Sequence, residues 1–370
     1  MIKLKKKIQF CFKKFFQLVF LLIYGKINYQ KDANISNNII KRKIENIHSD
    51  IKDSKSYFSY KIKNGRVYTD YVEHVAIIDG NTLINETSYQ QVSGELKNVK
   101  ENIVLTKGTP RIKKKIKGRV LSLIQGASGN KNYFHWLCDI LPKIKLCSEH
   151  YPLKEIDFFY APSLQDFQKQ TLSILNIDEN KILNSDTNRH IEARELITVD
   201  HPWYHKGFIL NEVEFLPAWI IHWLRDIYLK YAKQFDNNEK IYIDRTESEF
   251  KHCQIQNDKE VFVFLKEKGF SKYRTGELSF LEQIYLFNNA KFIIGAHGAA
   301  FTNLAFCKPN TNIIEIKPFT HPNNVNKRIS QINNLNYKLI KTKELNENQK
   351  KFGDIYLPIE TLKQCITSFD

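Results

Sequence analysis

Two short apolar runs flank a turn with two glycines and a lone histidine in the stretch FIIGAHGAAFTNLAFCKPNTNIIEI, residues 292–316. The first run predicts a buried strand, residues 298–307 predict a helix, and the second run predicts another strand. A strand, a helix and a strand in this order form a unit of a parallel sheet with a right-handed crossover. This stretch therefore places its part of the chain in the α/β class.

The same alternation of strands and helices extends along most of the sequence. A capping box, Ser279-x-x-Glu282, marks the start of one helix before the glycine-rich turn. The apolar runs that predict strands lie at 74–79, 119–124, 157–161, 195–199, 240–245 and 336–340. The segments that predict helices lie at 132–147, 163–175, 216–235, 258–267 and 357–368. Pro142 should end or kink the first of these helices.

The 370 residues suit two domains, and 42% hydrophobic residues suffice for real cores. We therefore expect two α/β halves, joined by a helix and facing a cleft, with candidate site residues just after strands. The expected parts are a basic amphipathic helix (1–26), linker and irregular structure (27–65), an N-terminal α/β domain (66–215), a joining helix (216–236), a C-terminal α/β domain (237–356) and a C-terminal helix (357–370).

The N-terminal stretch MIKLKKKIQFCFKKFFQLVFLLIYGK has a basic start and an apolar run. Lys13 and Lys14 interrupt that run, its uninterrupted part is too short to span a bilayer, and no small-residue cleavage site follows. As a helix, it would carry its apolar side chains on one face: Ile8, Phe12, Phe15, Val19 and Leu22. We expect an interfacial anchor on an anionic inner leaflet, which makes the protein cytoplasmic and peripheral on the plasma membrane. The alternative is an ordinary amphipathic helix docked on the domain.

The formal charge of +16 favours anionic partners. No basic stripe interleaved with aromatic residues and no known nucleic-acid motif occurs, which argues against nucleic acid as that partner. The six cysteines are scattered without a C-x-x-C pair, so free thiols are expected. Asp-x-Asp is absent, and no His/Cys/carboxylate cluster has metal-ligand spacing, so we expect neither a metal nor another cofactor.

The turn that holds His297 opens a helix, whose first amides lack intrahelical partners and carry partial positive charge. A phosphate suits such a position, and Gly298 would let it approach the backbone of Gly298 and Ala299. His297, Thr302 and Asn303 could supply further donors. The alternative is a tight turn with a helix-capping histidine.

A second group of polar residues falls on one face of the helix at 132–147, namely Asn132, His135 and Asp139, at spacings of three and four. A carboxylate four residues after a histidine can orient the ring and stabilise its protonated form, as a general base requires. The alternative is a buried histidine satisfied by its neighbour.

Two further cations follow predicted strands. Arg245 lies at the carboxyl end of the strand at 240–245, and Lys317 directly after the strand that ends the glycine-rich stretch. The planar guanidinium of Arg245 suits phosphate oxygens, so both side chains are candidates to compensate a diphosphate. The alternative for Arg245 is a surface ion pair with Glu247 or Glu249.

Together these segments resemble glycosyltransferase family 61, over about residues 125–317. NYFHWLCDILPKI resembles the first motif of the family, Asn-x-x-His-Trp-x-x-Asp-x-x-Pro, and IIGAHGAAFTNLAFCKPNTNIIEI resembles its last. YIDRTESEFKHCQIQNDKEV and LSFLEQIYLFNNAKFIIG fit between them. Lys251-His252 and Ala300 depart from the family pattern, where arginines and a glycine are frequent.

The resemblance implies a GT-B architecture, in which an N-terminal Rossmann-like acceptor domain (66–215) and a C-terminal Rossmann-like nucleotide-sugar domain (237–356) face a cleft. It also implies metal-independent transfer with inversion, from a nucleotide-diphosphate sugar to a glycan or lipid-linked acceptor. It places Arg245, His297, Gly298 and Ala299 near the donor diphosphate, and His135 or Asp139 near the acceptor. Asn132 and Trp136 of the first motif would then contact the acceptor. For prokaryotic members, it suggests capsule or lipopolysaccharide synthesis.

The expected mechanism has His135 deprotonate an acceptor hydroxyl while Asp139 orients the ring, and an alternative makes Asp139 itself the base. Two other functions stay open at this point. One is a sugar-nucleotide epimerase on the same fold, which would need no acceptor. The other is a non-catalytic, basic, membrane-associated polyanion-binding protein.

Overall fold

A computed structural model describes residues 2–29, 36–52, 56–69, 74–88, 90–92, 95–124, 131–203, 207–208, 215–246, 253–343, 345 and 353–369. The chain divides into two compact units. Unit 1 comprises Met1–Gln165 and Asn176–Ile209, and unit 2 comprises Asp166–Leu175 and Leu210–Asp370. The α/β class is confirmed, whereas the GT-B arrangement of two domains stays a prediction.

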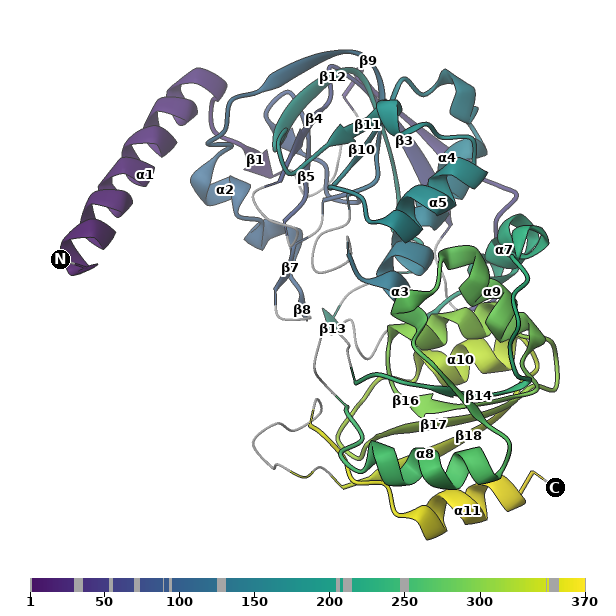
Figure 1. Ribbon diagram of the computed structural model, residues 1–370. Coiled ribbons are helices and arrows are strands. Elements are labelled where there is room, and N and C mark those ends of the chain that lie inside the picture. The colour runs from purple at the N-terminus through teal and green to yellow at the C-terminus, as the bar shows by residue number, and fades with distance from the viewer. Residues whose placement is uncertain are drawn as a thin grey trace. The chain divides into compact units, whose positions relative to one another are not determined.

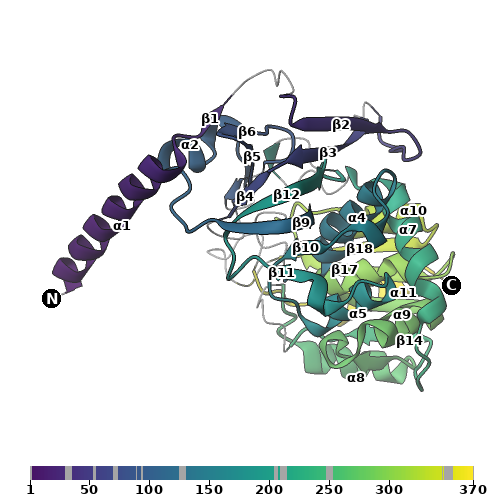
Figure 2. The same ribbon diagram turned by 90° about the horizontal axis from the view of Figure 1, so that it is seen from above.

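Unit 1 is built on a ten-stranded mixed sheet, in the order β1-β6-β5-β4-β12-β9-β10-β11, with β3 also on β12 and β2 on β3. Strands β12, β9, β10 and β11 are parallel, and β12 pairs antiparallel with β3 and β4. Figure 2 shows β2, β3, β12 and β9 side by side. The strands are β1 (Asn28–Tyr29), β2 (Ile39–Ile44), β3 (Tyr57–Lys63), β4 (Arg66–Tyr68), β5 (Ala76–Asp79), β6 (Thr82–Leu83), β9 (Lys114–Ser122), β10 (Phe158–Ala161), β11 (Ile182–Asn184) and β12 (His190–Val199).

Smaller elements complete unit 1. A three-stranded sheet joins β7 (Gln91–Val92), β8 (Glu95–Leu96) and β13 (Gly207–Phe208). The helices α1 (Ile2–Tyr24) and α2 (Val104–Lys107) precede β9 along the chain. Among the described residues, no helix combines the length and apolarity that crossing a bilayer requires.

The expectation of linker and irregular structure over 27–65 is wrong for the residues that the structure describes there. Strands β2 and β3 form an antiparallel pair in which Ile39 faces Ile62 and Ile44 faces Tyr57. Strand β2 has the sequence IIKRKI and exposes several of its polar side chains. Because such a strand is only partly buried, it lacks the apolar run by which the other strands were found.

The helix predicted over 132–147 consists of three segments: α3 (Tyr133–His135), the π-helical η3 (Trp136–Ile140) and α4 (Leu141–Ser148). Leu141 donates its N–H to the carbonyl of Trp136, five residues back. Pro142 has no N–H with which to continue the α-helical pattern, so the helix widens into a π turn instead of ending. This turn carries Asp139.

Unit 2 is built on a parallel five-stranded sheet, in the order β15-β14-β16-β17-β18. Numbered along the chain, these strands are in the order 2-1-3-4-5, a doubly wound topology whose switch point lies between β14 and β16. The strands are β14 (Lys240–Ile243), β15 (Ser271–Tyr273), β16 (Phe292–Ala296), β17 (Asn312–Pro318) and β18 (Asn336–Thr342).

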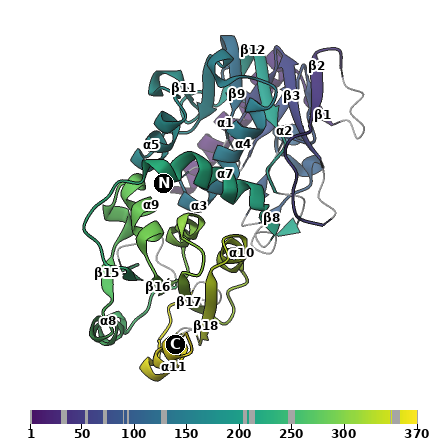
Figure 3. The same cartoon turned by 90° about the vertical axis from the view of Figure 1, so that its right-hand side faces the viewer.

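Helices cover both faces of this sheet: α8 (Asp258–Glu267) and α11 (Ile359–Thr367) lie on one, and α9 (Phe280–Asn289) and α10 (Val325–Ile332) on the other (Figures 1 and 3). The predicted capping box starts α9, where the Ser279 hydroxyl accepts from the Glu282 N–H and the Glu282 carboxylate from the Ser279 N–H. The turn after β16 leads into the 3-10 helix η9 (Ala299–Phe306), where an α-helix was expected.

Two helices before β14 also belong to unit 2. One is α5 (Asp166–Ile174), which the prediction had placed within the domain 66–215. The other is α7 (Ala218–Tyr228), which is shorter than the predicted 216–235 and continues as a 3-10 turn, Leu229–Tyr231. The Tyr228 hydroxyl donates to the Thr171 carbonyl at 3.3 Å, and the Phe280 N–H donates to Gln170 Oε1 at 2.9 Å. These bonds connect α5 to α7 and α9.

Candidate active site

The histidine and the carboxylate predicted on one face of the helix at 132–147 are in contact in unit 1. His135 Nδ1 lies 2.6 Å from Asp139 Oδ2, and Trp203 Nε1 donates to the other carboxylate oxygen, Oδ1, at 2.7 Å. Asp139 is fully buried, whereas the side chain of His135 is 16% exposed. With its Nδ1 proton directed at Asp139, the ring presents Nε2 as its basic atom.

Two residues predicted to contact an acceptor have structural roles. Asn132 caps α3, because its side-chain oxygen accepts from the N–H groups of Phe134 at 2.9 Å and His135 at 3.3 Å. Trp136 is fully buried. Successive helical residues point about 100° apart, so the side chain after His135 faces the core.

A buried lysine follows Asp139 by four residues. Lys143 donates from Nζ to the Ile124 carbonyl at 3.0 Å. Burial lowers the pKa of Lys143 to about 8, although the nearby Asp139 carboxylate acts in the opposite direction. No role was predicted for this lysine, since nothing in the nearby sequence marks it as buried.

The switch point of unit 2 brings Arg245 and Gly298 together. Strand β14 pairs with β16 up to Ile243 and Gly295, so both chains leave the sheet at the same edge. A Cβ added to Gly298 would lie 1.2 Å from Arg245 Nη1. We expected a ligand to approach the backbone at this glycine, but the guanidinium of Arg245 occupies that space. Glu247 and Glu249, the alternative partners of Arg245, lie outside the described residues.

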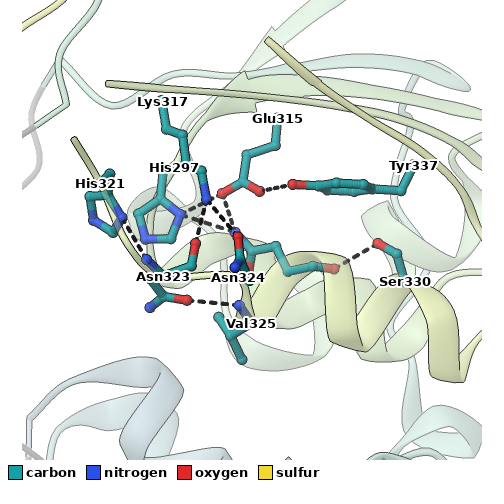
Figure 4. A network of polar contacts seen from close by, with 10 residues as sticks. His297, Glu315, Lys317, His321, Asn323, Asn324, Val325, Ser330 and Tyr337 are labelled. Carbon is teal, nitrogen blue, oxygen red and sulfur yellow. Dashed lines mark hydrogen bonds and ion pairs between the residues drawn. The ribbon is translucent and has the colours of Figure 1, made fainter. Parts of the chain in front are cut away.

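His297 forms the second histidine–carboxylate pair, with Glu315 of the neighbouring strand β17 (Figure 4). Its Nδ1 contacts Glu315 Oε1, which also accepts from Asn326 Nδ2 at 2.7 Å, and the Tyr337 hydroxyl donates to Oε2. Burial alone would raise the pKa of Glu315. The charge interaction and the hydrogen bond with His297 nevertheless hold the pKa of Glu315 below its ordinary value. Lys317 and Tyr337 act in the same direction.

The loop before α10 completes this polar network (Figure 4). The centroid of the buried His321 ring lies 4.1 Å from that of His297. Lys317 donates from Nζ to the Asn323 carbonyl and, at 3.3 Å, to Asn324 Oδ1. Lys317, a predicted diphosphate ligand, therefore holds the loop behind His297.

The remaining predicted donor-binding residues lie in η9. Thr302 and Asn303 are buried, and Asn303 Nδ2 donates to Gln283 Oε1 of α9 at 3.0 Å. Ala299 is partly buried at the start of η9, where Gly298 has no side chain with which to cap the helix. The structure thus brings Arg245, His297, Gly298 and Ala299 together, and it uses Asn303 for packing.

Sequence reasoning missed the carboxylate of one histidine–carboxylate pair and the aromatic donor to each carboxylate. Trp203 follows Asp139 by 64 residues, and Tyr337 follows Glu315 by 22. Glu315 is part of the quoted Ile-Glu strand, but no local pattern connects it to His297. Among the described residues, no group of three or more His, Cys, Asp or Glu side chains could hold a metal ion.

A comparison with known protein families matches the part of the chain that contains both histidines. The family described as Glycosyltransferase 61 matches residues 133–314. A bacterial iron-containing dodecameric glycosyltransferase, TibC from enterotoxigenic E. coli, is 12% identical over 72% of this chain and 76% of that chain. The TM-score between the two structures is 0.28. No curated protein matches the chain. Residues 133–314, which hold both histidines, thus place the protein in glycosyltransferase family 61, as a transferase.

Proposed function

We propose that the protein is a metal-independent, inverting glycosyltransferase that moves a sugar from a nucleotide-diphosphate sugar to a glycan or glycolipid acceptor. The family supports a sugar donor and an acceptor. The observation that carries the finer proposal is the switch point of unit 2, where the Arg245 guanidinium lies on Gly298, beside His297 and the first amides of η9. Cationic and amide donors in this position suit a diphosphate.

The donor half of the mechanism belongs to this edge of unit 2. When the bond between the anomeric carbon and the diphosphate breaks, its electron pair leaves with the diphosphate. Arg245 and His297 compensate that charge from protein groups. Glu315 is a positioning residue, because its buried negative charge holds Nδ1 of His297 and supports a protonated ring whose Nε2–H can donate to a phosphate oxygen.

The acceptor half belongs to His135. Its Nε2 takes the proton of an acceptor hydroxyl, and the oxygen attacks the anomeric carbon on the face opposite the leaving diphosphate. Asp139 is the positioning residue of this pair rather than the base, because it is fully buried and both of its oxygens already bind donors. The proposal therefore favours His135 over Asp139 as the base.

A role in bacterial capsule or lipopolysaccharide synthesis is part of the proposal and rests on the family resemblance alone. An acceptor screen with lipid-linked and free oligosaccharides would decide between a glycolipid and a glycan acceptor.

Thermal unfolding against a panel of nucleoside diphosphates and nucleotide-diphosphate sugars, with EDTA present, tests the donor site. A cognate nucleotide should raise the Tm as mass action requires, and Mg²⁺ or Mn²⁺ should add nothing. Arg245→Gln should abolish the rise, whereas Arg194→Gln, at an exposed position of unit 1, should retain it. A rise that needs the metal, or one that Arg245→Gln retains, would refute the proposed donor site.

A further inference from the structure

The N-terminal helix α1 contacts unit 1 through one side of its C-terminal half. Gln17 Nε2 donates to the Thr106 carbonyl at 3.4 Å, and the Tyr24 hydroxyl accepts from the Lys113 N–H at 3.0 Å. The ring of Tyr24 also packs edge-on against His190, with centroids 5.1 Å apart. These residues fix which side of the helix faces the protein.

The apolar face of α1 lies on another side and is left in solvent. Its side chains are exposed to 61% at Ile8, 63% at Phe12, 61% at Phe15 and 88% at Leu22. An amphipathic helix that served only to cover its own domain would bury this face. The helix does dock on unit 1, but not by its apolar face, so a large apolar surface has no cover within the described residues.

The charges around this face indicate what covers it. Lys6, Lys13 and Lys14 lie on the opposite side of α1 and are exposed. The whole chain carries a formal charge of +16, which would oppose the approach of a second copy. A helix with an apolar face and exposed lysines on its other side is complementary to an anionic bilayer surface, where apolar side chains enter the acyl boundary and lysines meet the headgroups.

We propose that α1 lies flat in the interface of an anionic membrane and holds the protein on the inner face of the plasma membrane. The bound face is formed by Ile8, Phe12, Phe15, Val19 and Leu22. This surface is separate from both histidine–carboxylate pairs, so the test below leaves the proposed reaction untouched.

Phe10 provides a matched control on the same helix. It is 62% exposed, like Phe12 and Phe15. Because two residues correspond to about 200° of rotation, Phe10 points away from Phe12 and toward the basic side. Phe12→Glu and Phe10→Glu therefore make the same chemical change at equal exposure, but only the first lies on the apolar face.

The test is co-sedimentation of the full chain with vesicles of phosphatidylcholine, with and without phosphatidylglycerol, at low and high salt. We expect the chain to bind the anionic vesicles, and we expect high salt to weaken this binding. Phe12→Glu with Phe15→Glu should reduce the partition coefficient at least tenfold, and Phe10→Glu should reduce it less. Lys13→Gln with Lys14→Gln should reduce it about fivefold for each lysine.

Sedimentation velocity without vesicles tests a second copy as the cover. A monomer is expected at all concentrations used in the vesicle assay. A dimer that Phe12→Glu dissociates would overturn the proposal, as would failure to bind the anionic vesicles. Equal losses from Phe10→Glu and Phe12→Glu would also overturn it, because the specific face would then have no role. Unchanged thermal unfolding of each variant verifies that the fold is intact.

Discussion

In unit 1, His135, Asp139 and Lys143 follow one another at steps of four residues along one helical segment. In unit 2, His297, Glu315 and Lys317 come from the ends of two neighbouring parallel strands, β16 and β17. Both carboxylates are fully buried, and both hold Nδ1 of their histidine. The same chemical arrangement is thus reached by a helical repeat in one unit and by strand pairing in the other.

The resemblance extends to the other partners of each carboxylate. An aromatic residue donates to the second oxygen: the indole of Trp203 to Asp139, and the hydroxyl of Tyr337 to Glu315. Each lysine donates to a main-chain carbonyl, and burial lowers the pKa of both Lys143 and Lys317 against the opposing effect of the carboxylates.

The two pairs differ in what surrounds the imidazole. The ring of Phe134 packs edge-on against His135, with centroids 5.2 Å apart. His297 has the His321 ring beside it, and the guanidinium of Arg245 lies on the next residue, Gly298. An imidazole among apolar rings suits proton transfer, whereas one beside a guanidinium and free helix amides suits anion binding. The surroundings, rather than the pair itself, distinguish the two proposed roles.

Removal of each imidazole tests this difference most strongly. His135→Ala should lower kcat about 10²–10⁴-fold and leave nucleotide affinity nearly unchanged, because a general base acts on the chemical step. His297→Ala should instead weaken nucleotide binding, as measured by titration calorimetry. His222→Ala, at an exposed position of α7, is the control. The assigned roles would be wrong if both variants lost affinity and retained kcat.

The buried lysine of unit 1 predicts a pH dependence of stability. Because the pKa of Lys143 is lowered from 10.5 to about 8, the unfolded chain binds this proton more tightly than the folded protein. The free energy of unfolding should therefore rise with pH between about 8 and 10.5, by about 3 kcal/mol relative to Lys143→Met. Urea unfolding at several pH values measures this difference, and Lys154→Met is the exposed control. A difference that does not vary with pH would contradict the lowered pKa.

Gly298, on which the Arg245 guanidinium lies, allows a more specific test of the proposed donor site in unit 2. Gly298→Ala forces the guanidinium away, since the added Cβ would lie 1.2 Å from Nη1. Loss of its charge-assisted hydrogen bonds costs about 1.5–3 kcal/mol, so nucleotide affinity should fall about 10–100-fold. Gly276→Ala, where no atom lies within 4 Å of the added Cβ, should have no effect. Unchanged affinity in Gly298→Ala would mean that Arg245 does not touch the donor.

The aromatic donors give the smallest predicted effects. Trp203→Phe and Tyr337→Phe each remove one hydrogen bond to a buried carboxylate, at a cost of about 1.5 kcal/mol, or about tenfold. The first should lower kcat, and the second should lower nucleotide affinity. If both variants changed only the thermal stability, the two carboxylates would serve to stabilise the fold and not to orient the imidazoles.

The sequence by itself determined the features that depend on residues close along the chain. The capping box of α9, most strands and helices of unit 2 and the contact of His135 with Asp139 follow from spacings of three or four residues, or from short apolar runs. Two elements of unit 2, the strand β15 and the helix α10, were not predicted. Strand β2 was missed because its exposed lysines and arginine hide the apolar alternation.

Only the tertiary structure decided the partners that lie far apart in sequence. Glu315 reaches His297 because β16 and β17 pair in a fixed register, and Trp203 reaches Asp139 across 64 residues. Likewise, Gly298 accommodates Arg245 because β14 and β16 end at the same edge of the sheet. The physical reason is that such contacts depend on strand register and on packing between elements, and neither leaves a local pattern in the sequence.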